Sequence, residues 1–505
     1  MNFSRRWFIG GGAALGAMQG CRVITDPAGL FRGGGANVKF GVISDVHVIA
    51  SDTDRGTCGN TRTLEHTLKW FDSQGVDAVM VAGDIADAGL VSELQVFADA
   101  WFKVFPNDRS TRDGRKVERL FIYGNHDWEG YRYGYQVFGR KSIDLQDDWI
   151  ADFGTKKTWE RLFGEEYSPV YRKNVKGYDF IGAHWDGDAK ANWTGMHAIE
   201  PWFKEHGGSI DPSKPFFYFQ HPHPKDTCYG SWAWGRDGGV STRTLSAFPN
   251  AVAFSGHSHY SLVDERTVWQ GAFTSLGTGS LRYAGTPDEE FPGEGYENTG
   301  GSKKDGEKTM ERGRRSDARN GMLVSVYDDC TVFRRRDFRH DADLGPDWVL
   351  PHAGAEPKPF AFAEHARKSK APEFEADAEV RAAPGTTMTR GARKSLKPKA
   401  TKDETEKAKS PAVIVSFPAV KRTFRSIAWR YEISVEREDG TCVAKKRILA
   451  ADFHLPAGSS KQSYTLAFLR SQLPAAGKLR FTVVPYDCFG NAGKGITSGF
   501  VSPEA

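Results

Sequence analysis

The feature that most constrains the fold of this chain is a series of short apolar segments that each end in polar side chains. The first three are "NVKFGVIS", "DAVMVAGD" and "VERLFIYGNHD". Helical patterns lie between them, in "TLEHTLKWFDSQG" and "LVSELQVFADAWFKVF". Strands that alternate with helices favour an α/β fold in which the strands end in functional loops.

Three later apolar segments continue the series, and each ends in histidine: "YDFIGAHW", "PFFYFQHPH" and "NAVAFSGHSH". Open α/β sheets place their functional sites at the carboxyl ends of the strands. Taken alone, an aspartate after a strand is often only a helix N-cap. The prediction of a site therefore depends on five strand ends together, with the candidate residues Asp45, His47, Asp84, Asn125, His126, His221, His223, His257 and His259.

The spacing of these residues suits metal binding. Alternate residues of an extended chain share a face, so Asp45 and His47, or His257 and His259, can point the same way. Carboxylate oxygen and imidazole nitrogen suit divalent Mn, Fe, Zn, Co or Ni, and the sequence does not choose among them. The candidates exceed the needs of one tetrahedral ion. We therefore expect two divalent metal ions that share a carboxylate, an arrangement used in phosphoryl transfer.

Together, "DVH", "GDIAD", "GNHD", a histidine after a strand and "GHSH" resemble the motif series of calcineurin-like metallophosphoesterases, from about Val38 to Leu350. The resemblance implies a four-layer αββα sandwich. It also implies a metal-dependent phosphoric ester hydrolase, in which a metal-bridging hydroxide attacks an organic phosphomonoester or phosphodiester.

The resemblance also implies roles for single residues. One metal would take Asp45, His47, Asp84 and His259, and the other would take Asp84, Asn125, His221 and His257, with Asp84 bridging. His126 would stabilise the transition state or protonate the leaving oxygen, and Asp127 would orient His126. His221 and His223 compete for one ligand position. We favour His221 because it directly follows the strand.

At three places the sequence departs from the motifs of known subfamilies of calcineurin-like metallophosphoesterases, and each departure disfavours one subfamily. Asp87 stands where purple acid phosphatases have a tyrosine, so a purple tyrosinate–iron site is not expected. Ala88 and Gly89 follow "GDIAD" where protein phosphatases of the family have Arg-Gly. Trp128 and Glu129 replace the continuation typical of secreted nucleotidases. The substrate is thus predicted only as a small organic phosphate ester.

The segment "YGSWAWGRDGG" could form a rim over the metals, with Trp232, Trp234 and Arg236 as substrate-binding residues. A packed aromatic loop is an equal alternative. A different functional class also stays open, a non-catalytic metal-dependent binding module for a phosphorylated glycan or lipid. The intact His126 favours the enzyme.

The N-terminus "SRRWFIGGGAALGA" looks like a twin-arginine export signal, with Arg5 and Arg6 before a short apolar run. That run is too short to span a bilayer. It predicts an exported protein, periplasmic or on the cell surface, with the twin-arginine export machinery as a partner. An alternative adds a lipid on Cys21 as a membrane tether.

Four parts are expected along the chain: an export signal and linker at 1–37, a catalytic domain at 38–352, a charged linker at 353–410 and a β-sandwich at 411–505. The linker could instead be a basic tether to an anionic surface. The last part loosely resembles a fibronectin type III-like domain, through "KLRFTVVPYDCFGNAGK". The net charge is only +4, and no basic stripe marks the first 350 residues, so no nucleic-acid partner is expected.

Overall fold

The computed structural model describes residues 35–49, 59–128, 155–185, 196–229, 236–285, 318–352, 356–388, 401–423, 426–450, 453–456 and 463–503. Several predictions lie outside these residues. They concern the export signal with Arg5, Arg6 and Cys21, and the aromatic residues Trp232 and Trp234. In the described part of the chain, no helix combines the length and apolar character that a membrane span requires.

One sheet of the predicted catalytic domain has the strand order β12-β11-β10-β1-β2-β3, and β13 pairs with β11. Strands β1, β2 and β3 are parallel, and the others are antiparallel. The bounds are β1 Val38–Ile43, β2 Ala78–Ala82, β3 Glu118–Ile122, β10 Asn320–Val326, β11 Cys330–Asp337, β12 Ala342–Asp343 and β13 Trp348–Pro351. Helices α1 (Gly59–Ser73), α2 (Val91–Val104), η1 (Pro106–Asp108) and α3 (Asn125–Trp128) lie between or after the parallel strands.

The second sheet has the order β4-β5-β6-β7-β9-β8, with β5, β6, β7 and β9 parallel. Its strands are β4 Val170–Val175, β5 Tyr178–Ala183, β6 Phe216–Gln220, β7 Ala251–Ser255, β8 Val268–Gln270 and β9 Thr274–Gly277. Its helices are α6 Thr155–Phe163, α7 Ile199–His206, η3 Gly207–Ser209, α8 Val240–Leu245 and η4 Glu265–Thr267.

The two sheets pack against each other through aromatic rings. Phe40 of β1 lies 5.0 Å from Phe180 of β5 and 4.9 Å from Phe217 of β6, between ring centroids. A separate core joins the first sheet to α1 and α2, and another joins the second sheet to α7 and α8. The predicted α/β class is confirmed as a mixed α/β fold with several sheets. The contacts are compatible with the αββα order, which stays a prediction.

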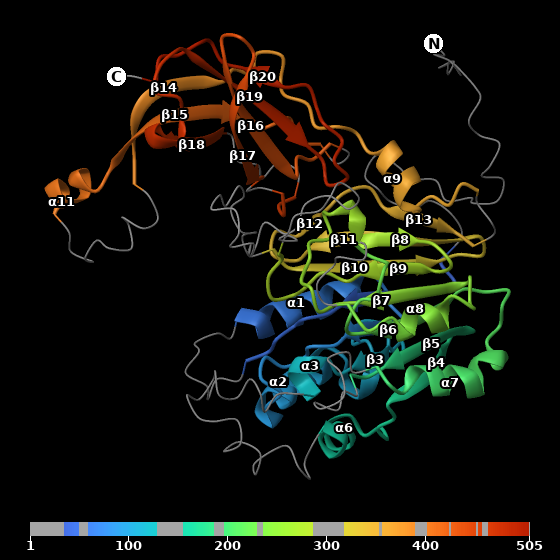
Figure 1. The fold of residues 1–505 in the computed structure, drawn as a ribbon. Coiled ribbons are helices and arrows are strands. Elements are labelled where there is room, and N and C mark those ends of the chain that lie inside the picture. Colours follow the sequence, from blue (N-terminus) through green and yellow to red (C-terminus); the bar gives the residue numbers. More distant parts are fainter. Residues whose placement is uncertain are drawn as a thin grey trace, which may run out of the picture.

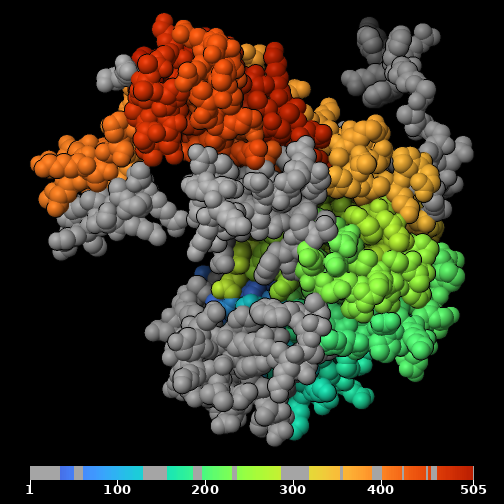
Figure 2. Space-filling model, viewed as in Figure 1, coloured from blue at the N-terminus to red at the C-terminus, as the bar shows by residue number. Residues whose placement is uncertain are grey.

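The C-terminal part forms two all-β sheets, β14-β15-β18 and β17-β16-β19-β20, at one end of the molecule (Figures 1 and 2). Their bounds are β14 Arg381–Thr387, β15 Ser410–Pro418, β16 Arg430–Arg437, β17 Cys442–Leu449, β18 Ser463–Leu469, β19 Leu479–Tyr486 and β20 Ile496–Thr497, with η5 at Arg470–Gln472. Along β19 every second residue is buried, as the alternating pattern predicts. The fibronectin type III-like assignment stays a prediction.

The structure differs from the predicted linker at 353–410. This segment contains α9 (Phe362–Lys368), α11 (Lys402–Lys407) and the whole of β14, which pairs with β15 over seven residues. Strand β14 reads "RAAPGTT" and is largely exposed, so it has no apolar signal of its own. Its backbone hydrogen bonds to a buried neighbour hold it in the sheet, as is typical of an edge strand.

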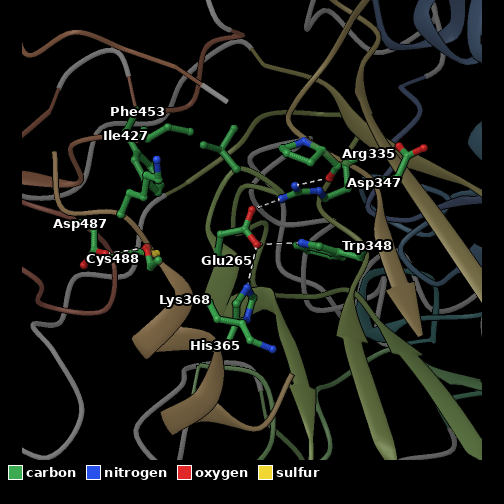
Figure 3. A pocket seen from close by; sticks show the side chains of 14 residues that line it. Glu265, Arg335, Asp347, Trp348, His365, Lys368, Ile427, Phe453, Asp487 and Cys488 are labelled. Carbon is green, nitrogen blue, oxygen red and sulfur yellow. Dashed lines mark hydrogen bonds and ion pairs between the residues drawn. The ribbon is translucent and has the colours of Figure 1, made fainter. Parts of the chain in front are cut away.

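Glu265 in η4 lies at the junction between the catalytic domain, α9 and the C-terminal sheets, beside a cavity of about 220 Å³ (Figure 3). Its carboxylate accepts hydrogen bonds from Arg335 at 2.7 Å, from the indole of Trp348 at 2.7 Å and from His365 at 3.0 Å. Burial acts to raise the pKa of Glu265, but Arg335 and His365 outweigh it and lower the pKa to about 2.

Replacing this carboxylate tests the junction. Because the folded pKa of Glu265 is depressed, its contribution to stability is present above its ordinary pKa of 4.5 and is lost as the pH falls toward 2. We expect Glu265→Gln to cost about 2 kcal/mol at pH 7, the scale of a buried hydrogen bond to a charged group. The difference from the native protein should shrink between pH 5 and pH 3.

Thermal unfolding at pH 7, 5 and 3 measures both effects. Glu375→Gln is the control, because the Glu375 side chain is 57% exposed and pairs with Lys421, which is 64% exposed. Equal melting temperatures of the native protein and Glu265→Gln at pH 7 would show that the junction does not depend on this charge.

Candidate metal centre

The polar loops of both sheets meet at the carboxyl ends of their parallel strands. The loops after β1, β2 and β3 supply Asp45, His47, Asp84 and Asn125, and those after β6 and β7 supply His221, His257 and His259. The structure brings six of these side chains into two groups, in each of which the potential ligand atoms lie within 4.8 Å of one another. The groups are Asp45, His47 and His259, and Asp84, His221 and His257.

In the first group, two imidazole nitrogens face one carboxylate. Nε2 of His259 lies 3.0 Å from Oδ1 of Asp45 and 3.1 Å from Nε2 of His47. Nδ1 of His47 lies 3.1 Å from Oδ1 of Asp87, the position from which it donates its proton. With its proton on Nδ1, His47 directs the lone pair of Nε2 at the other members of the group. Metal-bound histidines are commonly oriented in this way by a carboxylate that accepts the other ring N–H.

The second group repeats this arrangement around Asp84. Nε2 of His221 lies 3.1 Å from Oδ2 of Asp84 and 3.2 Å from Nδ1 of His257. Nδ1 of His221 donates to the carbonyl of Ala82 at 2.8 Å. Oδ2 of Asp84 also lies 3.6 Å from Nε2 of His47, so this carboxylate stands between the two groups.

Asn125 is buried at the start of α3, next to His126. The backbone N–H of His126 donates to Oδ1 of Asp84 at 2.9 Å, which brings this turn to the second group. Asn125 therefore lies beside the ligand set, and its role as a ligand stays a prediction.

The donor chemistry of both groups fits divalent cations. Each group sets two imidazole nitrogens about one carboxylate, and the facing nitrogens lie 3.1 Å apart in one group and 3.2 Å apart in the other. Two bare lone pairs at this distance repel each other unless a proton or a cation lies between them. Nitrogen and carboxylate oxygen together are a donor set for transition metals.

The protonation states agree with this interpretation. Burial acts against ionised Asp45, but His259 outweighs it and lowers the pKa of Asp45 to about 2. Burial lowers the pKa of His257 to about 3. Burial would also lower the pKa of His221, but Asp84 raises it to about 9. A proton on His221 and a cation beside Asp84 thus compete for the same carboxylate charge, so metal binding should release a proton.

Two glycines are required by the close approach of these side chains. Gly83 has φ of +87°, and a Cβ there would lie 2.4 Å from Nδ1 of His221. A Cβ at Gly124 would lie 2.3 Å from Oδ1 of Asp84. The glycines of "GDIAD" and "GNHD" therefore make room for the second group.

The two histidines of "HPH" have different surroundings. His221 faces Asp84, whereas both ring nitrogens of His223 lie 2.7 Å from serine hydroxyls, those of Ser255 and Ser258. Ser258 lies between His257 and His259, so the hydrogen bond from His223 to Ser258 stabilises the turn that carries these two histidines. The preference for His221 agrees with this geometry.

Asp127 differs from its predicted role. Its carboxylate accepts three backbone N–H groups, from Gly124, Ile85 and Ala86, and so joins the loops after β2 and β3. The ring of His126 is held instead by Asp87, whose carbonyl lies 2.6 Å from Nδ1 of His126. Arg236 is exposed, and its backbone bridges to that of His223.

Sequence reasoning missed two contributors to this site. Asp87 contacts His47 and His126, and the loop after β9 places Arg282 against Asp87. In the same loop the ring of Tyr283 lies 4.3 Å from that of His259. The rule that polar residues follow strands could have found this loop, because "TGSLRYAG" follows β9 directly.

Comparison with known proteins identifies this part of the chain. Residues 38–261 match the family model of calcineurin-like phosphoesterases. The chain contains a calcineurin-like phosphoesterase domain. Membership of this domain family implies that the domain binds divalent metal ions, for which the two groups supply candidate ligands. No curated protein matches the sequence.

Several solved structures are similar to the chain. A dimetal phosphatase from Danio rerio is 10% identical, with a TM-score of 0.34, over 63% of this chain and 100% of that one. A purple acid phosphatase from yellow lupin (Lupinus luteus) seeds is 12% identical, with a TM-score of 0.36, over 62% and 53%. Vps29 complexed with zinc from Entamoeba histolytica is 8% identical, with a TM-score of 0.25, over 62% and 99%. At such low scores, these likenesses carry no argument here.

A matched pair of variants tests the two histidines of "HPH", which are both buried. His221→Ala should lower the metal content of the protein by about one ion per chain, because it removes a candidate ligand of the second group. His223→Ala should keep the metal content but lose about 1–3 kcal/mol of stability, because two buried hydroxyls lose their partner. Elemental analysis after metal loading and thermal unfolding give the two readouts. The assignment is wrong if His223→Ala loses the metal and His221→Ala keeps it.

Proposed function

We propose that this protein is an exported dinuclear-metal phosphoesterase that hydrolyses an organic phosphomonoester or phosphodiester. The observation that carries the proposal is the pair of donor groups around Asp45 and Asp84, which lie beside the partly exposed His126. Within a calcineurin-like phosphoesterase domain, such a pair is suited to phosphoryl transfer.

The proposed ligands follow from the two groups. One metal ion is held by Asp45, His47, Asp84 and His259, and the other by Asp84, Asn125, His221 and His257. In support, Asp84 lies between the groups, 3.6 Å from His47 and 3.1 Å from His221. Bound divalent cations would supply Lewis-acid stabilisation of the phosphoryl oxygens and activation of water.

His126 is the proposed acid. Its Nδ1 donates to the carbonyl of Asp87, which fixes the orientation of the ring. The ring of His126 lies 4.6 Å from that of His47, so it stands directly beside the first group. From there Nε2 can stabilise the developing charge or protonate the leaving oxygen. Asp87 has a second role, since its carboxylate orients His47.

Substrate contacts and location are further parts of the proposal. Arg236 is exposed next to His223, where it can pair with a phosphate, and Trp232 and Trp234 would stack on the organic group. The Arg5-Arg6 signal would direct the protein through the twin-arginine export machinery to the periplasm or cell surface. Cys21 would be the point of any lipid anchor.

Two variants separate metal binding from proton transfer. Asp84→Ala should abolish both metal binding and hydrolysis, because it removes the shared carboxylate. His126→Gln should keep the metal content and lower kcat by about 10²- to 10⁴-fold, the usual contribution of a general acid. Metal analysis and hydrolysis of p-nitrophenyl phosphate and bis(p-nitrophenyl) phosphate measure these effects.

His66→Gln is the control, because the side chain of His66 is 47% exposed and pairs with Asp341, which is 55% exposed. Full hydrolysis by Asp84→Ala would refute the ligand assignment. A native protein that binds metal and phosphate ligands tightly but turns over neither ester would support the binding-module alternative.

A further inference from the structure

The loop that follows β9, residues 278–285, is hydrogen-bonded to the loops after β1 and β7, which carry candidate ligands from both sheets. The amide of Leu281 donates to the carbonyl of Ser44 at 3.1 Å, and the hydroxyl of Ser280 donates to the carbonyl of Asp45 at 3.2 Å. At its other end, the amide of Gly285 donates to the carbonyl of His259 at 2.7 Å. The loop is therefore a fixed wall of the candidate metal centre.

This wall sets Arg282 and Tyr283 beside the first donor group. The guanidinium of Arg282 forms an ion pair with Asp87, the residue that binds Nδ1 of His47 through its carboxylate and Nδ1 of His126 through its carbonyl. Arg282 and His126 thus both contact Asp87. The ring of Tyr283 packs against His259 and covers the same group.

Arg282 neutralises the charge of Asp87, but part of its side chain extends beyond this buried carboxylate. The Asp87 side chain is 5% exposed, whereas that of Arg282 is 31% exposed. The Arg282 side chain is therefore partly open to solvent while it pairs with a buried residue that also holds the ring of His126. A planar guanidinium at this place can keep its ion pair and also donate to an oxygen of a bound phosphate.

We propose that Arg282 is a substrate-binding residue that contacts a non-bridging phosphoryl oxygen and makes phosphomonoesters the preferred substrates. This inference rests on the proposed phosphoesterase function. A monoester dianion has three non-bridging oxygens, whereas a diester has two and one negative charge. The extra oxygen and charge of the monoester are what a fixed cation beside the metal groups can recognise.

Kinetics of the full-length, metal-loaded protein test the inference, with p-nitrophenyl phosphate and bis(p-nitrophenyl) phosphate as substrates. Arg282→Gln should lower kcat/KM for the monoester by about 10- to 100-fold, the range of one charge-assisted hydrogen bond. The diester should lose about threefold or less. Inhibition by inorganic phosphate should weaken in parallel with the monoester loss, while the metal content stays that of the native protein.

The matched control is Arg447→Gln, because the Arg447 side chain is also 31% exposed and pairs with Glu432 in the C-terminal sheets. Arg447→Gln should leave kcat/KM for both esters and the inhibition by inorganic phosphate unchanged. Arg282→Gln in an Asp87→Asn background identifies a purely neutralising role. If Arg282 serves only Asp87, Arg282→Gln should cost nothing in the Asp87→Asn background, and in the native background it should lower the hydrolysis of both esters equally.

The inference and the proposed function fail in different ways. A native protein that hydrolyses neither ester with any of the five candidate metals would refute the phosphoesterase function. A native protein that is active, with an unchanged monoester to diester ratio and unchanged phosphate inhibition in Arg282→Gln, would overturn only the role of Arg282.

Discussion

Aromatic packing between the two sheets of the catalytic domain determines where the metal groups can form. Phe40 of β1 contacts Phe180, Phe217 and Phe254, which come from three neighbouring strands of the other sheet. Neither sheet carries a complete donor group: Asp45 and His47 come from the first sheet, and His259 comes from the second. The members of each group come from different sheets. The ring contacts that set the distance between the sheets therefore also set the distance between these candidate ligands.

The loops that carry the ligands have unusual backbone conformations. Asp45, His47, Asp84, His257 and His259 all have φ between +47° and +70°. Each such non-glycine residue costs about 1–3 kcal/mol. Hydrogen bonds between loops hold this conformation, including those from Asp45 to the carbonyl of Gly83 and from His47 to the carbonyl of Asp84. These positive φ values turn the side chains toward the two groups, so the expectation that each pair shares one face of an extended chain is wrong.

Much of the site was predictable because its signals are local. Strand periodicity and the polar residues that follow each strand are visible in the sequence, and together they predicted Asp45, Asp84, His221 and the "GHSH" histidines. Arg282 and Asp87 were not predicted as partners, because only the folded arrangement brings the loop after β9 onto the loop after β2. Strand β14 was missed for a similar reason, since its stability comes from pairing with β15 and its own sequence has no apolar pattern.

The segment after the last ligand joins the candidate metal centre to the C-terminal sheets. Only five residues separate His259 from Glu265, the carboxylate that binds Arg335, Trp348 and His365 at the junction. Next to it, the buried Arg266 lies over the ring of Trp429, 4.8 Å from its centroid. Trp429 directly precedes β16, so the C-terminal sheets hold one end of a segment whose other end carries a ligand. Through the contact of Arg266 with Trp429, the C-terminal sheets are linked to the segment that carries the candidate ligand His259.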